Sequence, residues 1–296
     1  MKLDIVIVNY NSGQYLKYCL DALHKTNGIL HNSGVIVYDN GSTDASLKMA
    51  QEAFPRVRYI GNHVNLGFAR AVNRVIEQSS GEYILLLNPD TIVFPESIRL
   101  MLDFMTKNKQ CGVLGGELLS PSGYRQPTCR RFPNYVNVLF GRRSLMRRLF
   151  PDNPFSRRYL YAEMDPTKPH MVDFVEGSLM MIRRRALEDV GNFDEQLFLY
   201  VEDADICYRM KQHGWETWWL PQTYAIHYRG ETFRTDNIHP AMYHSRGLYT
   251  FFRKHYTPSF LTRLALRFFL TLRLVYVIAT GSLREVFHDI RLSPPR

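Results

Sequence analysis

Three carboxylates stand within four positions of the segment LYVEDADICYRMKQHGW, residues 199–215. A carboxylate such as Glu202, Asp203 or Asp205 can act as a general base when a hydroxyl group lies within hydrogen-bond reach. Acidic residues are equally common in the first turn of a helix, where they complement the helix dipole. On such a helix Asp205 and Arg209 stand four residues apart, which predicts a surface salt bridge. The segment alone therefore leaves a catalytic and a structural interpretation open.

Polar residues also follow four segments that have the pattern of β-strands. The segments LDIVIV, GVIVYDN, VRYIG and EYILLLNPD alternate with helical patterns at residues 12–26, 42–54 and 67–78. The first segment is a continuous apolar, β-branched run, which is typical of a strand buried on both faces. Strands that alternate with helices predict βαβ units and a parallel sheet. Ligands bind outside the carboxyl ends of such strands, so the tips NYN, DNGS, NHVNLG and NPD should meet at one site.

The pattern changes after residue 116, and the chain is long enough for one large α/β domain or two small ones. We expect short strands and turns at 115–133, a strand leading into a helix at 172–187, a helix at 202–214, and short strands at 215–221 and 223–228. Helical patterns dominate from Pro240 onward. We therefore predict a catalytic α/β domain at 1–235 and a helical C-terminal extension at 236–296, which could associate with a membrane or form an oligomer.

The chain carries a formal net charge of +9, and the positive charge is unevenly placed. Between residues 125 and 158 a single acid, Asp152, accompanies nine arginines, which are Arg125, Arg130, Arg131, Arg142, Arg143, Arg147, Arg148, Arg157 and Arg158. A second basic region follows Arg253. Such surfaces attract phosphates, nucleic acid or anionic lipid, and charge alone does not choose among them.

Cysteine usage and hydropathy bear on the compartment. The four cysteines are far apart and form no C-x-x-C pair, which favours a reduced, cytoplasmic chain. The chain enters its first strand pattern with no cleavable signal before it. The longest apolar segment, FFLTLRLVYVIATG, contains Arg273 and is shorter than the roughly 20 apolar residues of a membrane span. We expect a cytoplasmic protein. It could also associate peripherally with the inner face of the plasma membrane.

Taken together, the motifs VNYN, DNGSTDAS, NLGFARAVN, LLLNPD, VEGS, YVEDADICYRMKQHGW and IHYRG resemble family 2 glycosyltransferases of the GT-A fold. Within that family they look most like bacterial rhamnosyltransferases of cell-surface polysaccharide assembly. The resemblance covers about residues 3–230 in one order and spacing. It implies a Rossmann-like mixed sheet and an inverting transferase that uses a nucleotide-diphosphate sugar, with dTDP-rhamnose as the best choice of donor, and a divalent metal, Mg²⁺ or Mn²⁺.

The resemblance also assigns residues to the donor nucleotide. It places Asp39 where a carboxylate accepts a hydrogen bond from the N3–H group of uracil or thymine. Asn9 and Asn11 are expected along the base and ribose. Asn65 and Gly67 open the third predicted helix, whose N-terminus could face the nucleotide or the sugar.

The metal-binding motif departs from the usual family pattern. The sequence NPD stands where relatives have a D-x-D-type motif, so Asn88 replaces the first acid on the donor side and Asp90 offers the carboxylate. His227 matches a position that supplies a further metal ligand in the family. One or two carboxylates with phosphate oxygens and water are sufficient for a diphosphate-bound Mg²⁺, whereas imidazole suits Mn²⁺ better.

The motif AVN also departs from the family pattern, because Val72 stands where many relatives carry arginine. Asn73 could therefore take part in binding or could simply pack within the protein.

By resemblance, Asp203 is the general base that removes the proton of the acceptor hydroxyl. Glu176 and Gly177 of the motif VEGS are expected on the acceptor side, where a glycine allows close approach of a substrate. Glu202 would orient the loop or the acceptor, and Asp205 is expected to be structural.

Two other functions compete with transfer of a sugar to a glycan or lipid-linked acceptor. A sugar-nucleotide pyrophosphorylase would need a glycine-rich basic loop after the first strand, which NYNSGQY does not supply. A catalytically inactive module that binds membrane or nucleic acid would be favoured by loss of Asp203 or Asp90, and both are present. We therefore expect a glycosyltransferase that does not bind nucleic acid.

The C-terminal extension supports two interpretations. Its basic residues fall within an arc of about 120° on a helical wheel. This arc holds Arg263, Arg267, Arg273 and Arg284, together with Leu266, Leu270 and Leu274. Such a helix either packs on the catalytic domain or in a homodimer, or lies on an anionic membrane surface.

Overall fold

The computed structural model describes residues 2–25, 33–136, 153–228 and 238–280, and its centre is a mixed sheet of ten strands. The strands of the main path follow the order β3 (Arg58–Asn62), β2 (Ser33–Asn40), β1 (Leu3–Asn9), β4 (Tyr83–Leu87), β11 (Leu179–Arg183), β6 (Cys111–Leu119), β12 (Glu216–His227) and β5 (Thr91–Val93). The short strands β7 (Arg125–Gln126) and β9 (His170–Met171) pair with β6 and β12. A separate pair is formed by β8 (Cys129–Arg130) and β10 (Phe174–Val175).

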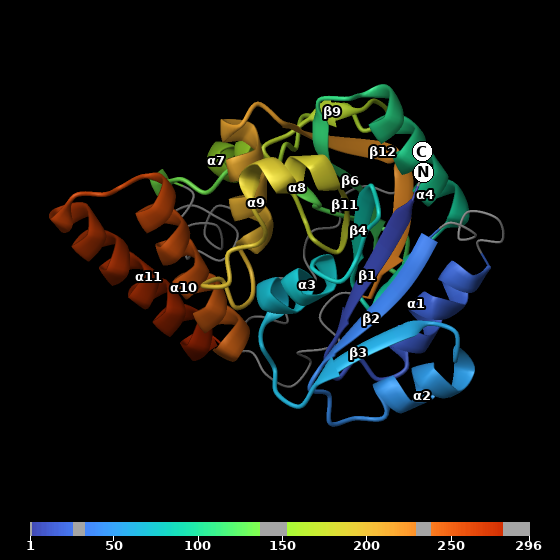
Figure 1. The fold of residues 1–296 in the computed structure, drawn as a ribbon. Coiled ribbons are helices and arrows are strands. Elements are labelled where there is room, and N and C mark those ends of the chain that lie inside the picture. Colours follow the sequence, from blue (N-terminus) through green and yellow to red (C-terminus); the bar gives the residue numbers. More distant parts are fainter. Residues whose placement is uncertain (1, 26–32, 137–152, 229–237, 281–296) are drawn as a thin grey trace.

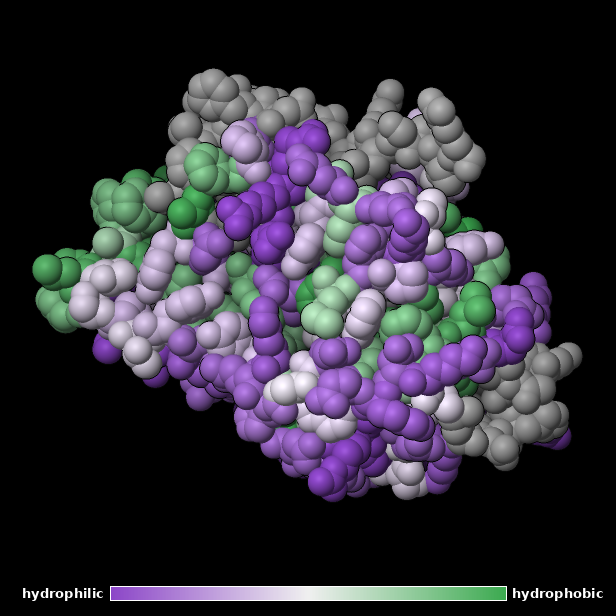
Figure 2. Space-filling view, turned by 90° about the horizontal axis from the view of Figure 1, so that it is seen from above, coloured by the Kyte–Doolittle hydropathy of each residue, from purple (hydrophilic) through white to green (hydrophobic). Residues whose placement is uncertain are grey.

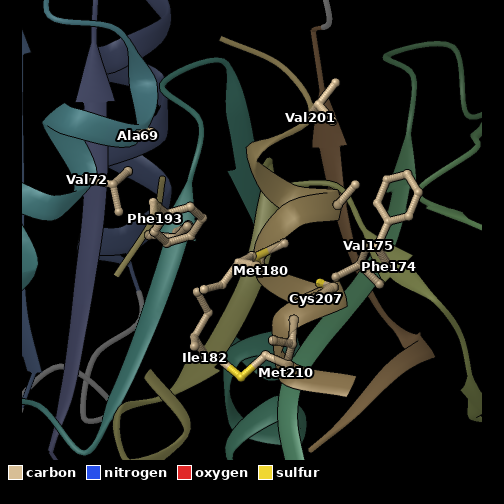
Figure 3. Packing of buried hydrophobic residues seen from close by; sticks show 14 of the residues in the cluster. Ala69, Val72, Phe174, Val175, Met180, Ile182, Phe193, Val201, Cys207 and Met210 are labelled. Atoms are coloured by element: carbon tan, nitrogen blue, oxygen red, sulfur yellow. The ribbon is translucent and has the colours of Figure 1, made fainter. Parts of the chain in front are cut away.

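Helices cover both faces of the sheet, and β1 shows why. Leu3, Ile5 and Ile7 share one buried cluster with α1 (Tyr15–His24), α2 (Ser46–Ala53) and α4 (Pro95–Lys107). Val6, which points to the other face, joins the cluster that contains α3 (Phe68–Ile76), α8 (Arg184–Val190) and α9 (Glu202–Gln212). Since successive side chains of a strand point to opposite faces, a continuous apolar run fits a strand between two helical layers. Figure 1 shows these layers, and Figure 3 shows the packing on the α3 and α9 side.

The sheet is parallel only in part. β3, β2, β1 and β4 are parallel neighbours, as the alternation of strands and helices predicted. β11 then lies antiparallel between β4 and β6, so the mixed sheet implied by the family resemblance is confirmed. Because β11 runs the other way, its first residues reach the edge at which the parallel strands end, which brings the segment 176–178 to the strand tips.

One strand prediction beyond residue 110 was right and one was wrong. The segment 115–133 holds the short strands β7 and β8, as expected, and also the end of β6, a nine-residue strand that begins at Cys111. The segments 215–221 and 223–228 are one twelve-residue strand, β12, with a register shift between Leu220 and Tyr224. Pro221 lies in this irregularity, where a residue without an N–H group can be accommodated. Helix α4 was not predicted from the sequence.

The C-terminal helices α10 (Ile238–His255) and α11 (Phe260–Thr280) form a layer at one end of the molecule (Figure 1). Leu248, Phe251 and Phe252 of α10 belong to the same buried cluster as Ile206 of α9. The boundary at residue 235 stays a prediction, but α10 shares the catalytic domain's core. In the part of the chain that the structure describes, no helix has the length and hydropathy needed to cross a membrane.

Candidate active site at the strand tips

Asp39 lies at the end of β2 and is held by its neighbours. Its Oδ1 accepts a hydrogen bond from Asn9 Nδ2 at 2.8 Å, and its Oδ2 accepts one from the backbone N–H of Ser42 at 3.0 Å. Asn9 is fully buried and also donates to Ser46 Oγ at 2.9 Å. The predicted position of Asn9 along the base and ribose is corrected by this burial: the residue orients Asp39 and has no exposed surface for a ligand.

Asn11 ties the first two strand tips together. Its backbone adopts a left-handed conformation with φ of 48°, which asparagine tolerates better than most residues. Its Oδ1 accepts hydrogen bonds from the backbone N–H groups of Thr43 at 2.7 Å and Asp44 at 3.3 Å. Asn11 is half-buried, so unlike Asn9 it keeps surface at the tip of β1, and its contact with the nucleotide stays a prediction.

The start of α3 is tied to the segment that precedes the acidic cluster. Asn65 Oδ1 accepts hydrogen bonds from Asn40 Nδ2 and from the backbone N–H of Gly67, both at 2.9 Å. The backbone N–H of Phe68 donates to the carbonyl oxygen of Phe198 at 2.7 Å. This first helical N–H group is therefore used within the protein, which weakens the expectation that the N-terminus of α3 faces the donor.

Gly67 is required by the close approach of these two segments. Its φ is +84°, and a Cβ atom there would lie 2.4 Å from the carbonyl oxygen of Phe198. Gly67→Ala should therefore lower the free energy of unfolding by about 3 kcal/mol, because left-handed strain and overpacking each cost about 1–3 kcal/mol. Chemical denaturation measures this loss.

Gly123→Ala is the matched control for that substitution. Gly123 has φ of +83° but no atom within 4 Å of the position of a Cβ. It should report the backbone strain alone, about 1 kcal/mol. Equal losses for the two variants would show that the contact with Phe198 does not matter.

Asp90 and His227 meet between β4 and the end of β12, as the metal prediction requires. His227 Nε2 lies 3.3 Å from Asp90 Oδ1, and both side chains are buried. His227 Nδ1 lies 3.1 Å from Gln126 Oε1, so a proton on Nδ1 would leave Nε2 as the atom free to bind a cation. Thr91, paired with His227 across β5 and β12, has a buried hydroxyl without a hydrogen-bond partner among the described residues.

This donor set fits a divalent cation that is bound together with a diphosphate. The described residues contain no group of three or more His, Cys, Asp and Glu side chains placed to hold a metal. One carboxylate and one imidazole are sufficient when phosphate oxygens and water complete the shell. Asn88 sits beside this pair and donates from Nδ2 to Ser178 Oγ at 3.1 Å, which links the end of β4 to the start of β11.

Asp203 lies in a second cluster, at the first turn of α9. It is half-buried, and its Oδ1 accepts a hydrogen bond from the backbone N–H of Ala204 at 2.8 Å. Tyr200 and Val201, just before α9, both have left-handed backbones with φ of 69° and 74°. Such conformations in residues other than glycine cost free energy and are concentrated at functional sites.

Arg130 and Glu176 complete this cluster, although no sequence motif assigned a site role to Arg130. The guanidinium and the Glu176 carboxylate form an ion pair at 2.5 Å, with 11% and 12% of their side chains exposed. Glu176 directly precedes Gly177 and Ser178, so the segment 176–178 connects this cluster to Asn88 beside the Asp90–His227 pair. At Gly177 a Cβ would meet only Phe68, at 3.7 Å, so the protein itself leaves room there.

The electrostatics of the cluster suit a base. Burial raises the pKa of Asp203 to about 6, while the Arg130 guanidinium opposes this and Glu176 adds to it. Burial, and then the charges of Asp203 and Asp205, raise the pKa of Glu202 well above its usual range. Glu202 Oε2 is buried without a hydrogen-bond partner among the described residues. A carboxylate with a pKa of about 6 can accept a proton near neutral pH, and the raised pKa of Glu202 favours the protonated form of its carboxyl group.

Asp205 is structural, but its salt bridge is not at the surface. The side chain is fully buried, and Asp205 Oδ2 accepts a hydrogen bond from Arg209 Nε at 2.9 Å. Asp205 Oδ1 lies 2.7 Å from His255 Nε2 of α10, and Lys254 Nζ lies 2.9 Å from the same oxygen. These partners hold the pKa of Asp205 near 2 although burial acts in the opposite direction. The predicted surface pair is corrected to a buried network because α10 covers this part of α9.

Asn73 packs, as the alternative interpretation expected. Its Nδ2 donates to the carbonyl oxygen of Phe193 at 2.9 Å, and its Oδ1 accepts from the backbone N–H of the same residue at 3.0 Å.

The arginines between residues 125 and 158 are not all available to bind a ligand. One of them, Arg125, forms an ion pair with Glu117 at 3.7 Å. Arginines 142, 143, 147 and 148, and Arg284 of the C-terminal arc, lie outside the described residues.

Arg130 gives a directional prediction for pH dependence. A base with a pKa of about 6 is ionised above that pH, so kcat should fall as pH drops through about 6. Arg130→Gln removes the charge that lowers this pKa, and the acidic limb should move to higher pH. Glu176→Gln removes a charge that raises it, and the limb should move to lower pH. Shifts of both variants in the same direction in a pH–kcat profile would contradict the cluster as drawn.

Comparison with known proteins identifies the family of this chain. A family model described as glycosyl transferase family 2 matches residues 4–191, more than half of the chain. The chain belongs to glycosyl transferase family 2. The N-acetylglucosaminyl-diphospho-decaprenol L-rhamnosyltransferase of Mycobacterium tuberculosis is 30% identical over 260 residues, which cover 84% of this chain and 83% of the relative. Rhamnosyltransferase WbbL of Escherichia coli K12 is 25% identical over 235 residues, covering 76% and 82%.

Solved structures of other glycosyltransferases and nucleotide-sugar complexes share the fold. The mannosyltransferase PcManGT from Pyrobaculum calidifontis, in complex with GDP-Man and Mn²⁺, superposes with a TM-score of 0.59 at 14% identity, covering 96% of this chain and 75% of that one. Residues 1–349 of S. aureus TarS in complex with UDP-GlcNAc give a TM-score of 0.54 at 16% identity, covering 99% and 77%. The predicted GT-A fold with a helical C-terminal segment is thereby confirmed, and this family 2 chain is a nucleotide-sugar glycosyltransferase of the kind that builds cell-surface polysaccharide.

Proposed function

We propose that this family 2 enzyme is an inverting, metal-dependent rhamnosyltransferase that transfers rhamnose from dTDP-rhamnose to a lipid-linked or glycan acceptor. The observation that carries the proposal is the half-buried Asp203, whose pKa is raised to about 6, connected through the segment 176–178 to the Asp90–His227 pair. The choice of rhamnose rests on the names of both relatives, and the choice of a lipid diphosphate acceptor rests on the name of the Mycobacterium tuberculosis relative.

The proposed chemistry is a single displacement at the anomeric carbon. The acceptor oxygen forms a bond to that carbon while the bond to the diphosphate oxygen breaks, and the electron pair of the broken bond leaves with the diphosphate. Asp203 takes the proton of the acceptor hydroxyl. General-base catalysis of this kind raises the reaction rate by about 10²–10⁴-fold. A divalent cation held by Asp90 and His227 would, when bound, offset the charge on the leaving diphosphate.

Residues around the base are proposed to receive the acceptor. Gly177 leaves space that the protein does not fill, and Glu176 is paired with Arg130. Glu202, with its raised pKa, can donate a hydrogen bond from a protonated carboxyl group to an acceptor hydroxyl. Asp39, Asn11 and Asn65 stand at the neighbouring strand tips, where we propose that the nucleotide binds.

The rival functions are less well supported by the site. A pyrophosphorylase has no use for an ionised carboxylate matched to an acceptor hydroxyl. An inactive binding module gives no reason for the buried Glu202 and the half-buried Asp203 to stand side by side at a cost in desolvation. The four cysteines are buried and free, in keeping with a proposed cytoplasmic site of action at the inner face of the plasma membrane. Binding of nucleic acid is not part of the proposal, and a homodimer stays a prediction.

A donor panel tests the proposal together with the role of Asp39. Transfer to a lipid-diphosphate N-acetylglucosamine acceptor should be fastest with dTDP-rhamnose and much slower with UDP-GlcNAc or GDP-mannose. Asp39→Ala should reduce discrimination among dTDP, UDP and GDP in competition assays more than it changes sugar preference. If the mutant keeps the wild-type ranking and affinities, Asp39 does not contact the base.

A further inference from the structure

Helix α11 presents a continuous apolar face to solvent. Of the fifteen exposed large hydrophobic residues in the described part of the chain, seven lie on this helix. Leu261, Leu264, Phe268, Leu272 and Val275 follow one another at helical spacing and form a single stripe, with exposures from 49% to 75%. Figure 2 shows hydrophobic residues gathered at the end of the molecule that α11 forms in Figure 1. We call these five residues the α11 stripe.

The stripe is not the side that packs on the protein. Leu266 and Leu270, on the opposite side of α11, are buried in the main core cluster, and Leu274 packs near Ala241 of α10. The arc that combined leucines and arginines in the sequence therefore faces α10, and the apolar stripe faces away from it. These buried leucines attach α11 to the rest of the protein. The stripe therefore takes no part in the packing of α11 against α10.

On a helical wheel Arg263 and Arg267 lie between the α11 stripe and the buried side that faces α10. Residues 238–280 contain five arginines, one lysine and neither aspartate nor glutamate. Arg267 lies over the ring of Tyr249 with Cζ 4.9 Å from its centroid, which places it beside α10. Four of the arginines are exposed at the surface of the two helices, and they are Arg246, Arg253, Arg263 and Arg267.

We propose that the α11 stripe docks in the interfacial region of an anionic lipid bilayer, with the bordering arginines on lipid headgroups. An apolar helix face flanked by arginines is the pattern of helices that lie in the membrane plane, and anionic headgroups attract each nearby arginine. A second copy of the chain fits less well, because pairing two stripes would bring two borders of like charge together. The choice of a membrane rests on the proposed function, in which the acceptor is lipid-linked.

The docked helix would be connected to the catalytic loop through α10. The rings of Phe198 and Tyr243 stack with centroids 4.5 Å apart. A Cβ on Gly247 of α10 would lie 2.9 Å from the carbonyl oxygen of Tyr200. α10 is thus packed between the membrane-facing helix and the loop that precedes Asp203.

Vesicle flotation with the full-length chain tests this docking. Vesicles of phosphatidylcholine with about 30% phosphatidylglycerol should bind the protein, pure phosphatidylcholine should bind it less, and binding should fall as salt rises because headgroup contacts are screened. Leu264→Glu with Phe268→Glu should reduce binding to the anionic vesicles at least tenfold. Leu100→Glu with Met171→Glu, which alters two exposed residues of α4 and β9 by the same charge, should leave binding unchanged.

The activity assays separate this proposal from the proposed function. The Leu264/Phe268 variant should retain transfer to a water-soluble acceptor and lose at least tenfold in transfer to an acceptor embedded in vesicles. Equal vesicle binding by the variant and the wild type would overturn the docking, as would a wild type that ignores anionic vesicles at low salt. A wild-type dimer that the substitutions convert to a monomer, without vesicle binding by either, would assign the stripe to a subunit interface and also overturn it. Absence of transfer to the soluble acceptor by the wild type would instead count against the proposed function.

Discussion

Replacing Asp203 by asparagine should lower kcat by about 10²–10⁴-fold while donor affinity stays close to that of the wild type. The amide has nearly the same shape as the carboxylate but cannot accept the acceptor proton. The loss should appear in kcat because the proposed base acts on the acceptor and not on donor binding. Steady-state kinetics combined with calorimetric titration of the donor measure both quantities.

Glu202→Gln is the matched control for Asp203→Asn. Burial raises the pKa of the Glu202 carboxyl well above its usual range, so replacing it by an amide of the same shape removes less than the loss of the proposed base does. We expect a loss of less than tenfold for this variant. If Asp203→Asn retains more than about a tenth of wild-type kcat, a barrier change below about 1.4 kcal/mol, Asp203 is not the base.

Removing the proposed cation should have the second large effect. Chelation by EDTA should stop transfer, and Mn²⁺ or Mg²⁺ should restore it. Asp90→Ala should lower activity by at least about 100-fold, because stabilisation of a diphosphate by a cation contributes several kcal/mol. His227→Ala should cost less than Asp90→Ala, since a neutral imidazole contributes no charge. Isothermal titration of the donor with and without metal measures the loss of metal-dependent binding directly.

Asp103→Ala serves as the control for Asp90→Ala. Asp103 is an exposed carboxylate on α4 and does not contact the site residues described above. Its removal should leave activity and metal response unchanged. Full activity of the wild type in the presence of a chelator would remove the cation from the mechanism, whatever the variants do.

The parallel half of the sheet was predictable because its signals are local. In β1 a run of apolar, β-branched residues specifies a strand between two helical layers, and Asn11, two residues after its end, carries the turn. By contrast, the partners of β6 and β12 are far apart in sequence, and the irregularity near Pro221 divides the pattern of one long strand into two. Local periodicity does not contain these long-range pairings.

Site residues were predictable where the type of residue indicates its chemical role. They were less predictable where the role depends on which side chains the fold buries together. Asp90 and His227 are 137 positions apart, and the family motifs placed them together as the structure does. Arg130 was missed because its partner Glu176 is 46 residues away and it stands among many other arginines. Asp205 is buried because α10 packs on α9. The acidic segment contains no pattern that predicts this packing.

The stereochemistry of the product tests the central claim most directly. A displacement at the anomeric carbon with Asp203 as base, without a glycosyl-enzyme intermediate, must invert that carbon. NMR spectroscopy of the product formed from dTDP-rhamnose and a lipid-diphosphate N-acetylglucosamine should therefore show a single anomer, opposite in configuration to the donor. A product with the donor's anomeric configuration would contradict the assignment of Asp203 as a general base in an inverting transfer.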